Sequence, residues 1–578
     1  MKKTVSLFLI LMLLLGGLTT AAAEGQARVF NLEFPIFCCE VESVLNHDWP
    51  LYFMDGVEDV PWIDLEELAD VMNDLLHDVY ERPSFQLTYS QEGSQFTLKR
   101  ENGFWMKVNY KDNTITFNDY NAFVQKPGNE TLLDLLAFSG FNEAGEAELF
   151  QRDAKASYDR FGDLMTLDLT DYDIHLVMDG DRGYIPLQTA NDFVVSRVTN
   201  RSLLYNGMAL FFANADDMYD REAQDVNDLG KLYFAAEPAK RSTALADFGY
   251  KELCMMLDSQ YGLKKKHNVD YFAHLFWEIG FDEELTAASS ENADYALHSF
   301  INFYLDDLHS AYGYSSWMTG LGMPYEEGNG PSNRLYDNQE DQYKAIRSKL
   351  LGDKVEAYQE VGNTAYITFD EFASKYKTAY YYKAASEGTR VEDTIGLIVY
   401  ASQQINRENS PIENVVIDLS INGGGDADAA LFVISWILGE AEVSVEDSFT
   451  GAQSTMVYRA DVNLDRQFDE KDTLKGKHVY CLISPLSFSC GNLVPAVCKA
   501  NQAVTLIGRT SGGGACVVQT MSTAWGTTFQ ISGNSRLSFR KNGSFYDIDE
   551  GIAPDVYISR LETLYDREKL NDLINNLP

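Results

Sequence analysis

Cysteine is scarce in this chain. Seven cysteines occur in 578 residues, and no two of them form a Cys-x-x-Cys pair. An odd number of cysteines at such low density excludes a small protein whose fold is held together mainly by disulfide bonds. The missing pair argues against a structural zinc site.

Basic residues are also few. Lys and Arg number 46 against 87 Asp and Glu, which gives a formal net charge of −41 and a pI near 4.4. Nucleic acids and anionic membranes attract proteins with basic surfaces, so this balance argues against both as partners. The acidity itself favours solubility and does not indicate a substrate.

After its first residues, the chain has no apolar run long enough to cross a bilayer. At the start, Lys2 and Lys3 precede an apolar run over residues 5–15, and alanines follow at 21–23. This order predicts a secretory signal peptide over residues 1–23. We therefore expect a secreted, extracellular or cell-envelope protein with no stable membrane span, and an uncleaved signal anchor is the alternative.

The length of the chain predicts two to four domains. Segments 28–150 and 151–240 share a pattern in which an aromatic residue, proline and leucine precede a short helix. We interpret them as two α+β modules, related as a diverged repeat, and they resemble small modules of secreted bacterial enzymes. Residues 241–320 have helical periodicity, with Leu253, Met256 and Leu257 on one face, and predict a helical region.

A serine-rich turn lies at residues 487–492. The apolar run over 479–483 predicts a buried strand before it, and residues 493–499 have helical spacing after it. A serine between a strand and a helix exposes its hydroxyl beside unpaired backbone N–H groups, which is what acyl transfer requires. Ser489 is the candidate nucleophile, and an ordinary loop of small residues is the alternative.

A second turn is rich in glycine. The predicted strand over 415–419 leads into Asn422-Gly423-Gly424-Gly425, and an apolar helix is predicted over 429–438. Backbone N–H groups of such a turn can bind an anion. No Gly-Lys-Ser or Gly-Lys-Thr follows, which disfavours a nucleotide P-loop. A tight turn without a ligand is the alternative.

Four motifs occur in an order that resembles the tail-specific, or C-terminal processing, serine protease family. They are Asp418 to Gly425, Ser489 to Asn492, Gly508 to Gly512, and Gly551 to Asp555. Relatives of this family include the tricorn protease core and the retinoid-binding repeats of the interphotoreceptor matrix. The resemblance implies a protease core over residues 361–565, with a first strand near Tyr366 to Phe369.

The resemblance also implies a fold and a chemistry. It implies a multidomain α+β protein in which α+β modules and a helical cap precede a crotonase-like α/β core of ββα units. The activity would be that of a secreted serine endopeptidase acting on polypeptide substrates through an acyl-enzyme. Ser489 would attack the peptide carbonyl, and N–H groups of Gly423, Gly424 and Cys490 would hold the oxyanion.

The general base is the point at which this chain departs from many family members. Those members have a lysine in the downstream glycine loop, where this chain has Gly513 or Gly514, and no lysine lies between Lys499 and Lys541. The other branch of the family uses a histidine in an Asp-x-His-Ser/Thr motif, which Asp307 to Ser310 match.

His309 is therefore the predicted base, because its unperturbed pKa lies near neutral pH. His298 precedes a serine but lacks the aspartate, so it is the second candidate. We interpret the other histidines as surface or core residues. They are His47, His77, His175, His267, His274 and His478.

A histidine base needs a carboxylate that orients it. In the histidine-using relatives this acid comes just before the closing Gly-x-x-Pro-Asp segment, where this chain has Asp547, Asp549 and Glu550. We favour Asp549, and each of the three has the alternative of a solvated loop acid.

An acidic insertion in the core suggests a structural calcium ion, although the reaction itself requires no cofactor. The spacing is that of an EF-hand or dockerin loop, but Arg466 stands where glycine is usual, and the twelfth position is not glutamate. A solvated acidic hairpin is the alternative. The candidate ligands are Asp461, Asn463, Asp465, Asp469 and Asp472.

Two other functions compete with proteolysis. One is a non-catalytic ligand-binding protein on the same fold, and the other is a cell-envelope interaction protein with an idle core. The presence of both Ser489 and His309 favours the enzyme, because a binding protein needs neither. The interval between His309 and Tyr366 is too short for the peptide-binding PDZ domain of many family members, so we expect none.

Overall fold

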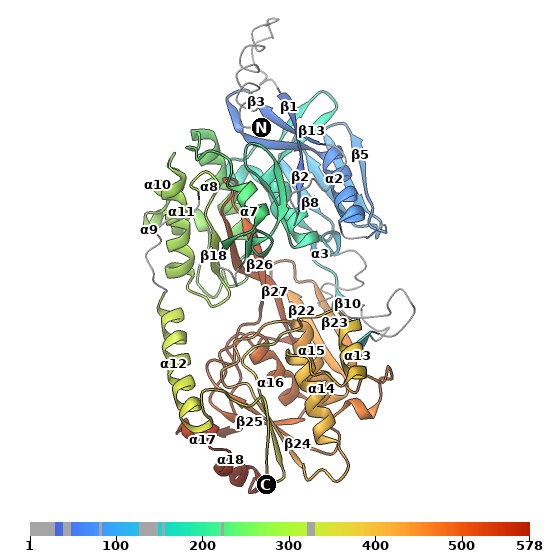
Figure 1. The fold of residues 1–578 in the computed structure, drawn as a ribbon. Coiled ribbons are helices and arrows are strands. Elements are labelled where there is room, and N and C mark those ends of the chain that lie inside the picture. The colour runs from blue at the N-terminus through green and yellow to red at the C-terminus, as the bar shows by residue number, and fades with distance from the viewer. Residues whose placement is uncertain are drawn as a thin grey trace, which may run out of the picture.

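The chain folds into two lobes, and one long strand runs through both (Figure 1). The computed structural model describes residues 29–38, 48–79, 82, 84–125, 148–152, 157–220, 225–320 and 330–577. The predicted signal peptide over 1–23 lies outside the described residues. Among the helices that are described, none is both long and apolar enough to cross a membrane.

Two five-stranded sheets dominate the N-terminal lobe. The first has the order β1 (Val29–Phe34), β3 (Trp49–Met54), β4 (Val57–Asp64), β13 (Arg182–Pro186) and β12 (Val177–Asp179). The second has the order β11 (Met165–Asp168), β8 (Thr114–Phe117), β7 (Trp105–Asn109), β6 (Gln95–Arg100) and β5 (Leu87–Glu92).

Each of these sheets takes strands from both predicted modules. Strand β13 pairs with β4, and β11 pairs with β8. The predicted boundary at residue 150 therefore does not separate two folding units. Strand pairing is non-local, and a pattern of residues within each segment does not reveal which distant strand will be the partner.

The region predicted to be helical contains α8 (Thr243–Gln260), α9 (Phe272–Ile279), α11 (Ser290–Ser299) and the π-helical turn η3 (Phe300–Leu305). Helix α8 begins where the Ser242 hydroxyl accepts the N–H of Leu245. Its residues Leu253, Met256 and Leu257 are buried, as the periodicity predicts. The helices end at residue 305, and strand β18 (Ala311–Tyr314) follows.

A six-stranded sheet forms the centre of the C-terminal lobe. Its order is β19 (Tyr358–Val361), β20 (Thr364–Thr368), β21 (Asn414–Asp418), β24 (His478–Ile483), β25 (Val504–Gly508) and β29 (Val556–Tyr557). The neighbours from β20 to β29 are parallel. Because the carboxyl ends of parallel strands share one edge of a sheet, the turns after β21 and β24 lie together.

Helices cover both faces of this sheet. Val415 and Ile417 of β21 pack in the core that includes α14 (Thr394–Ile405), α15 (Ala427–Leu438) and α16 (Cys490–Ala500). Val416, which points to the opposite face, packs with α12 (Pro331–Leu351) and α18 (Arg567–Asn575). The prediction of a multidomain protein with an α/β core is confirmed at this level.

Strand β27 (Thr528–Lys541) belongs to both lobes (Figure 1). Near its start it pairs with β18, where Gln530 lies opposite Ala311. Near its end it pairs with β22 (Ala441–Asp447), where Ser538 lies opposite Ser444. This strand therefore holds the turn that precedes β18, which contains His309, beside the C-terminal lobe.

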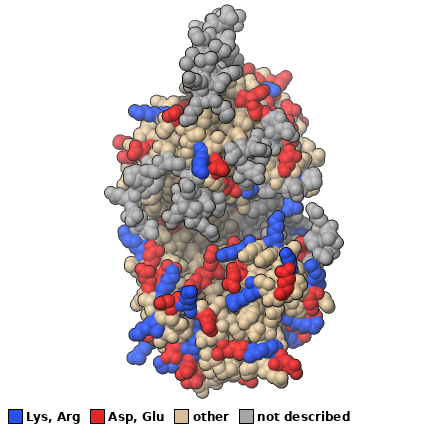
Figure 2. Space-filling model, viewed as in Figure 1, with Lys and Arg blue, Asp and Glu red and all other residues tan. Residues whose placement is uncertain are grey.

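Charged side chains of both signs are interspersed over the C-terminal lobe on the face drawn in Figure 2. Acidic residues exceed basic ones by 41 in the whole chain. Among the described residues visible in this view, the basic side chains form no extended patch.

Candidate active site

Ser489 lies between β24 and α16 in an unusual backbone conformation. Its φ is 53° and its ψ is −122°, a combination that side-chain-bearing residues seldom adopt. Neighbouring segments hold it there: the N–H of Ser489 donates to the carbonyl of Gly513 at 2.8 Å, and that of Phe488 donates to Asn422 at 3.1 Å. Such a turn presents the serine side chain at the start of a helix, as acyl transfer requires.

The glycine-rich turn packs directly on this serine. Gly424 has a φ of +115°, and a Cβ atom there would lie 2.7 Å from the Cβ of Ser489 and 3.2 Å from its Oγ. Only glycine fits this position, because both the backbone conformation and the contact exclude a side chain. The two motifs that the sequence placed far apart thus meet at the Ser489 hydroxyl.

Some backbone N–H groups near Ser489 already donate a hydrogen bond, and others do not. Gly424 donates to the side chain of Asn422 at 3.0 Å, and Gly423 donates to the carbonyl of Asp370 at 3.3 Å. The N–H groups of Cys490 and Gly425 make no hydrogen bond with any described residue. Cys490 is the first residue of α16, where the helix itself supplies no acceptor.

Gly425 was not among the predicted oxyanion residues. It forms a parallel bridge with Phe372, and its carbonyl accepts the Cys490 thiol at 3.2 Å. The thiol thus ties the glycine turn to the start of α16. Burial raises the pKa of Cys490 to about 12, so the thiol stays protonated and is a poor nucleophile.

His309 lies in the turn between η3 and β18, and it is buried against the nucleophile turn. Its ring centroid is 4.6 Å from that of Phe488, the residue before Ser489. Burial lowers the pKa of His309, and the charges of Asp307 and Asp549 oppose this shift. The imidazole is therefore neutral at neutral pH, which is the state of a general base.

Asp307 holds the His309 turn in place. One of its oxygens accepts the N–H groups of His309 and Ser310 at 3.0 and 2.9 Å. The same carboxylate accepts the hydroxyls of Tyr261 and Ser532, both at 2.8 Å. This aspartate therefore fixes the backbone of the histidine and joins α8 to β27.

Asp549 is the best shielded of the three candidate acids, with a side chain 10% exposed. Asp547 pairs with Arg536 at 2.7 Å, and the Glu550 side chain is 83% exposed. Burial would raise the pKa of Asp549, but hydrogen bonds from Lys266 and the N–H of Ala515, with charges that include His309, hold it below its ordinary value. Asp549 is therefore ionised.

The site contains no direct hydrogen bond between its predicted members. Ser489, His309 and Asp549 are all among the described residues, and no bond joins the histidine ring to either partner. Hydrogen bonds of this kind often tighten only when substrate binds. His298 accepts from the amide of Asn302 at 2.8 Å if its Nε2 is unprotonated, and its ring packs on Tyr312 rather than on the nucleophile turn.

Two glycines of the downstream loop have no room for a side chain. Gly514 has a φ of +84°, and a Cβ there would collide with the ring of Phe488. Gly513 has a φ of +81°, and a Cβ there would collide with the carbonyl of Asp549. The space that a side chain would need is filled by the ring of Phe488 and by the backbone of Asp549.

The acidic insertion does not form a cage of oxygen ligands. Asp461 accepts the N–H groups of Asp465 and Arg466 and the hydroxyl of Tyr382. The two oxygens of Asp472 accept the N–H groups of Asn463 and Asp469.

The other predicted ligands also bond to nearby backbone. The Asn463 and Asp465 side chains accept from Asp465 and Gln467, and the Asp469 side chain accepts from Lys471. In the part of the chain that is described, no three His, Cys, Asp or Glu side chains are grouped to hold a metal. Calcium binding by this loop stays a prediction, because a carboxylate that accepts a backbone N–H retains further lone pairs that can bind a cation.

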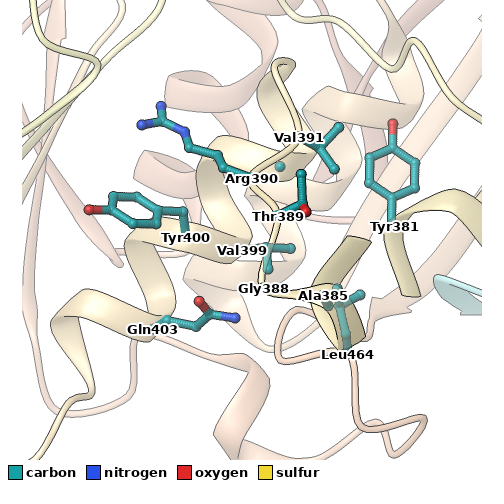
Figure 3. Close-up of a pocket in the computed structure, with 11 residues that line it drawn as sticks. Tyr381, Ala385, Gly388, Thr389, Arg390, Val391, Val399, Tyr400, Gln403 and Leu464 are labelled. Atoms are coloured by element: carbon teal, nitrogen blue, oxygen red, sulfur yellow. The ribbon is translucent and has the colours of Figure 1, made fainter. Parts of the chain in front are cut away.

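A separate cavity of about 210 Å³ lies between α13 (Thr378–Glu387) and α14 (Figure 3). Val391, Val399 and Leu464 line it, and the guanidinium of Arg390 lies 4.9 Å from the ring of Tyr400 at its side. None of the predicted catalytic residues lines this cavity.

Lys266 is the functional candidate that the sequence reasoning missed. It reaches from the loop after α8 to Asp549, with 2.8 Å between its Nζ and the carboxylate. The available signal was Lys264-Lys265-Lys266, three consecutive lysines in a chain whose net charge is −41.

Residues 363–558 match the model of peptidase family S41. This span includes the glycine turn, Ser489 and Asp549, whereas His309 lies before it. No curated protein matches the chain.

The solved structures that match part of the chain have low sequence identity to it. They include a putative peptidase from Parabacteroides merdae (15% identity, TM-score 0.40, 55% of this chain and 93% of that chain). A lipoprotein from Streptococcus agalactiae is 14% identical, with a TM-score of 0.34, over 57% of this chain and 97% of that chain. Mature CPAF bound to lactacystin is 11% identical, with a TM-score of 0.37, over 57% of this chain and 97% of that chain.

Proposed function

Because residues 363–558 form a domain of peptidase family S41, the chain is a serine-type peptidase. From this premise we propose that it is a secreted endopeptidase with a Ser-His-Asp mechanism. Ser489 is the nucleophile, His309 the general base and Asp549 the acid that stabilises the histidine. The observation that carries this proposal is the packing of three distant segments around Ser489. These are the Gly424 turn, the His309 turn through Phe488, and the Asp549 loop through Gly513.

In the first half of the reaction, His309 removes the proton of the Ser489 hydroxyl as Oγ attacks the peptide carbonyl. The carbonyl oxygen becomes an oxyanion, and the N–H of Cys490, with an N–H of the glycine turn, stabilises it. The imidazolium then gives its proton to the leaving amine, which departs and leaves an acyl group on Ser489.

In the second half, His309 deprotonates a water molecule that attacks the acyl carbonyl. The second tetrahedral intermediate uses the same N–H donors, and its collapse releases the new carboxyl end and restores Ser489. Asp549, which is ionised, stabilises each imidazolium that forms. Asp307 acts through the backbone of His309 and keeps the ring on the side of Phe488.

The cap that supplies the base is part of the N-terminal lobe, so we propose that residues 241–320 and 361–565 must both be present for activity. Residues 1–23, by their order of basic, apolar and small residues, would direct the chain out of the cytoplasm. The substrates would be polypeptides, and an unfolded protein is the suitable first probe.

The test is active-site labelling of the full mature chain. A fluorophosphonate probe should label Ser489, and Ser489→Ala should abolish both labelling and cleavage, at a cost on the order of 10⁶ in kcat. Cys490→Ala should keep most of the activity, because its N–H remains. Labelling of Cys490 in the native chain, or full activity of Ser489→Ala, would refute the assignment.

The base is tested by a matched pair of histidines. His309→Ala should be as damaging as Ser489→Ala, because the two residues act as a unit. His298→Ala removes a histidine from the same region without touching the nucleophile turn and should be milder. Equal losses in the two variants would contradict the role of His309.

A further inference from the structure

One ion pair links the cap to the acid of the proposed site. The Nζ of Lys266 lies 2.8 Å from Asp549 and 2.8 Å from Glu550, across a sequence separation of 283 residues from Asp549. The Asp549 side chain is nearly buried, whereas that of Lys266 is 46% exposed. A cation from one lobe thus neutralises a shielded carboxylate from the other.

The two lysines before Lys266 do not make this contact. Lys264 pairs with Asp258 at 2.7 Å, which lies in α8 of the same lobe. Lys265 is exposed and makes no ion pair with any described residue. Three adjacent lysines therefore have three different surroundings, and Lys266 alone among them pairs with Asp549.

Each oxygen of the Asp549 carboxylate accepts a hydrogen bond from a different segment. Its Oδ1 accepts the N–H of Ala515 at 3.0 Å, and its Oδ2 accepts from Lys266. The Asn492 amide donates to the carbonyl of Ile548 at 3.0 Å, which fixes the backbone beside the acid. The other ionisable groups that act on or flank Asp549 are His309, His267, Tyr261, Cys516, Asp547 and Glu550.

We propose that Lys266 is a positioning residue of the peptidase, which holds the Asp549 carboxylate ionised and directed for its role beside His309. This inference rests on the proposed function of Asp549. It makes the cap a supplier of two parts of the site: the base, His309, and the cation that maintains the acid. The lobes must then be correctly docked for the acid as well as for the base.

The physical reason is the cost of a shielded carboxylate. Burial is the largest effect on the pKa of Asp549 and raises it. Without Lys266, this effect would be opposed by the Ala515 N–H and by weaker charges, so the pKa would rise. A neutral Asp549 cannot stabilise an imidazolium. Activity would therefore be lost as pH falls through the raised pKa, and it would return at higher pH, where the carboxylate ionises again.

The experiment compares pH profiles of kcat/KM for Lys266→Met, Lys266→Arg and the matched control Lys265→Met in the full mature chain. We expect Lys266→Met to lose about tenfold or more of its activity near pH 6 and to recover to within a few-fold of the native enzyme near pH 9. Lys266→Arg should keep the native profile, because arginine retains the charge. Lys265→Met should match the native enzyme throughout.

Two further measurements keep the result interpretable. Thermal unfolding at both pH values tests whether Lys266→Met is folded, and Lys266→Gln replaces it if it is not. If the profile of Lys266→Met, or of Lys266→Gln where that variant replaces it, superimposes on the profile of Lys265→Met, the inference is overturned. Asp549→Asn separates this failure from failure of the proposed function. If Asp549→Asn is active, the proposed role of Asp549 as the acid is refuted. If Asp549→Asn is inactive and Lys266→Met keeps the native profile, only the role of Lys266 is refuted.

Discussion

The imidazole of His309 packs on the ring of Phe488, with 4.6 Å between the two ring centroids. These residues come from different lobes, and Phe488 is joined directly to Ser489. The contact therefore sets the position of the proposed base relative to the proposed nucleophile, and it suggests how the site can be disturbed without removing either of them.

Phe488→Ala should lower kcat without changing the titrating groups. The substitution removes the surface on which His309 packs, and a small displacement of a base can cost on the order of 10²-fold. Phe488→Tyr keeps the ring and should be milder. Steady-state kinetics on one peptide substrate would check both, and unchanged kcat in Phe488→Ala would contradict this role.

Gly424→Ala should abolish cleavage while the chain stays folded. The added methyl group would lie 2.7 Å from the Cβ of Ser489, so the nucleophile must move. Gly476→Ala is the control, because Gly476 has a similar positive φ of +83° but open space around it. Activity and melting temperature should be measured for both. If Gly476→Ala loses as much activity, backbone strain rather than the contact is the cause.

The acid limb of the kcat/KM profile should lie below the ordinary histidine pKa, near 6.5. Burial lowers the pKa of His309, so the ring remains neutral, and active as a base, down to lower pH. Activity is then lost as pH falls through this lowered pKa. A profile that is still rising well above neutral pH would indicate a lysine base instead.

Glu252→Gln should stabilise the chain at alkaline pH. Asp192 and Glu252 are each 1% exposed, and burial raises the pKa of both carboxyls, with the charge of Asp192 adding to the shift at Glu252. Groups whose folded pKa is raised favour folding at low pH, and this contribution is lost as pH rises through the folded pKa.

Thermal unfolding near pH 5 and pH 8 measures this effect. The native chain should lose more stability between the two than Glu252→Gln, which should melt about 2 °C or more higher near pH 8. Glu291→Gln, which changes an exposed glutamate, is the control and should follow the native chain. Equal pH dependence in all three would show that folding does not raise the pKa of Glu252.

Millimolar calcium should raise the melting temperature, because the sequence predicts calcium ligands in the acidic loop that contains Asp461 and Asp465. A ligand that binds only the folded chain would raise it. Unfolding with millimolar calcium and with a chelator tests this expectation. Asp465→Ala should remove this rise, and an unchanged melting temperature in the native chain would leave the loop as a solvated acidic hairpin.

The sequence by itself was sufficient for features that depend on residues close together in the chain. The strand before Ser489, the glycine turn and the closing Gly551 to Asp555 motif are local, and the family resemblance they support is confirmed by the match over residues 363–558. That the turns after β21 and β24 meet follows from the parallel sheet of the structure, in which the carboxyl ends of neighbouring strands share one edge.

Tertiary structure decided what depends on distant residues. The pairing of β4 with β13, and of β8 with β11, could not be predicted from the sequence of either module. Long-range packing decides which strands become partners. The same holds for the Phe488 contact of His309 and for the lysine that neutralises Asp549. A run of three lysines looks alike in the sequence, and only the docking of the cap onto the core gives Lys266 a different partner from Lys264.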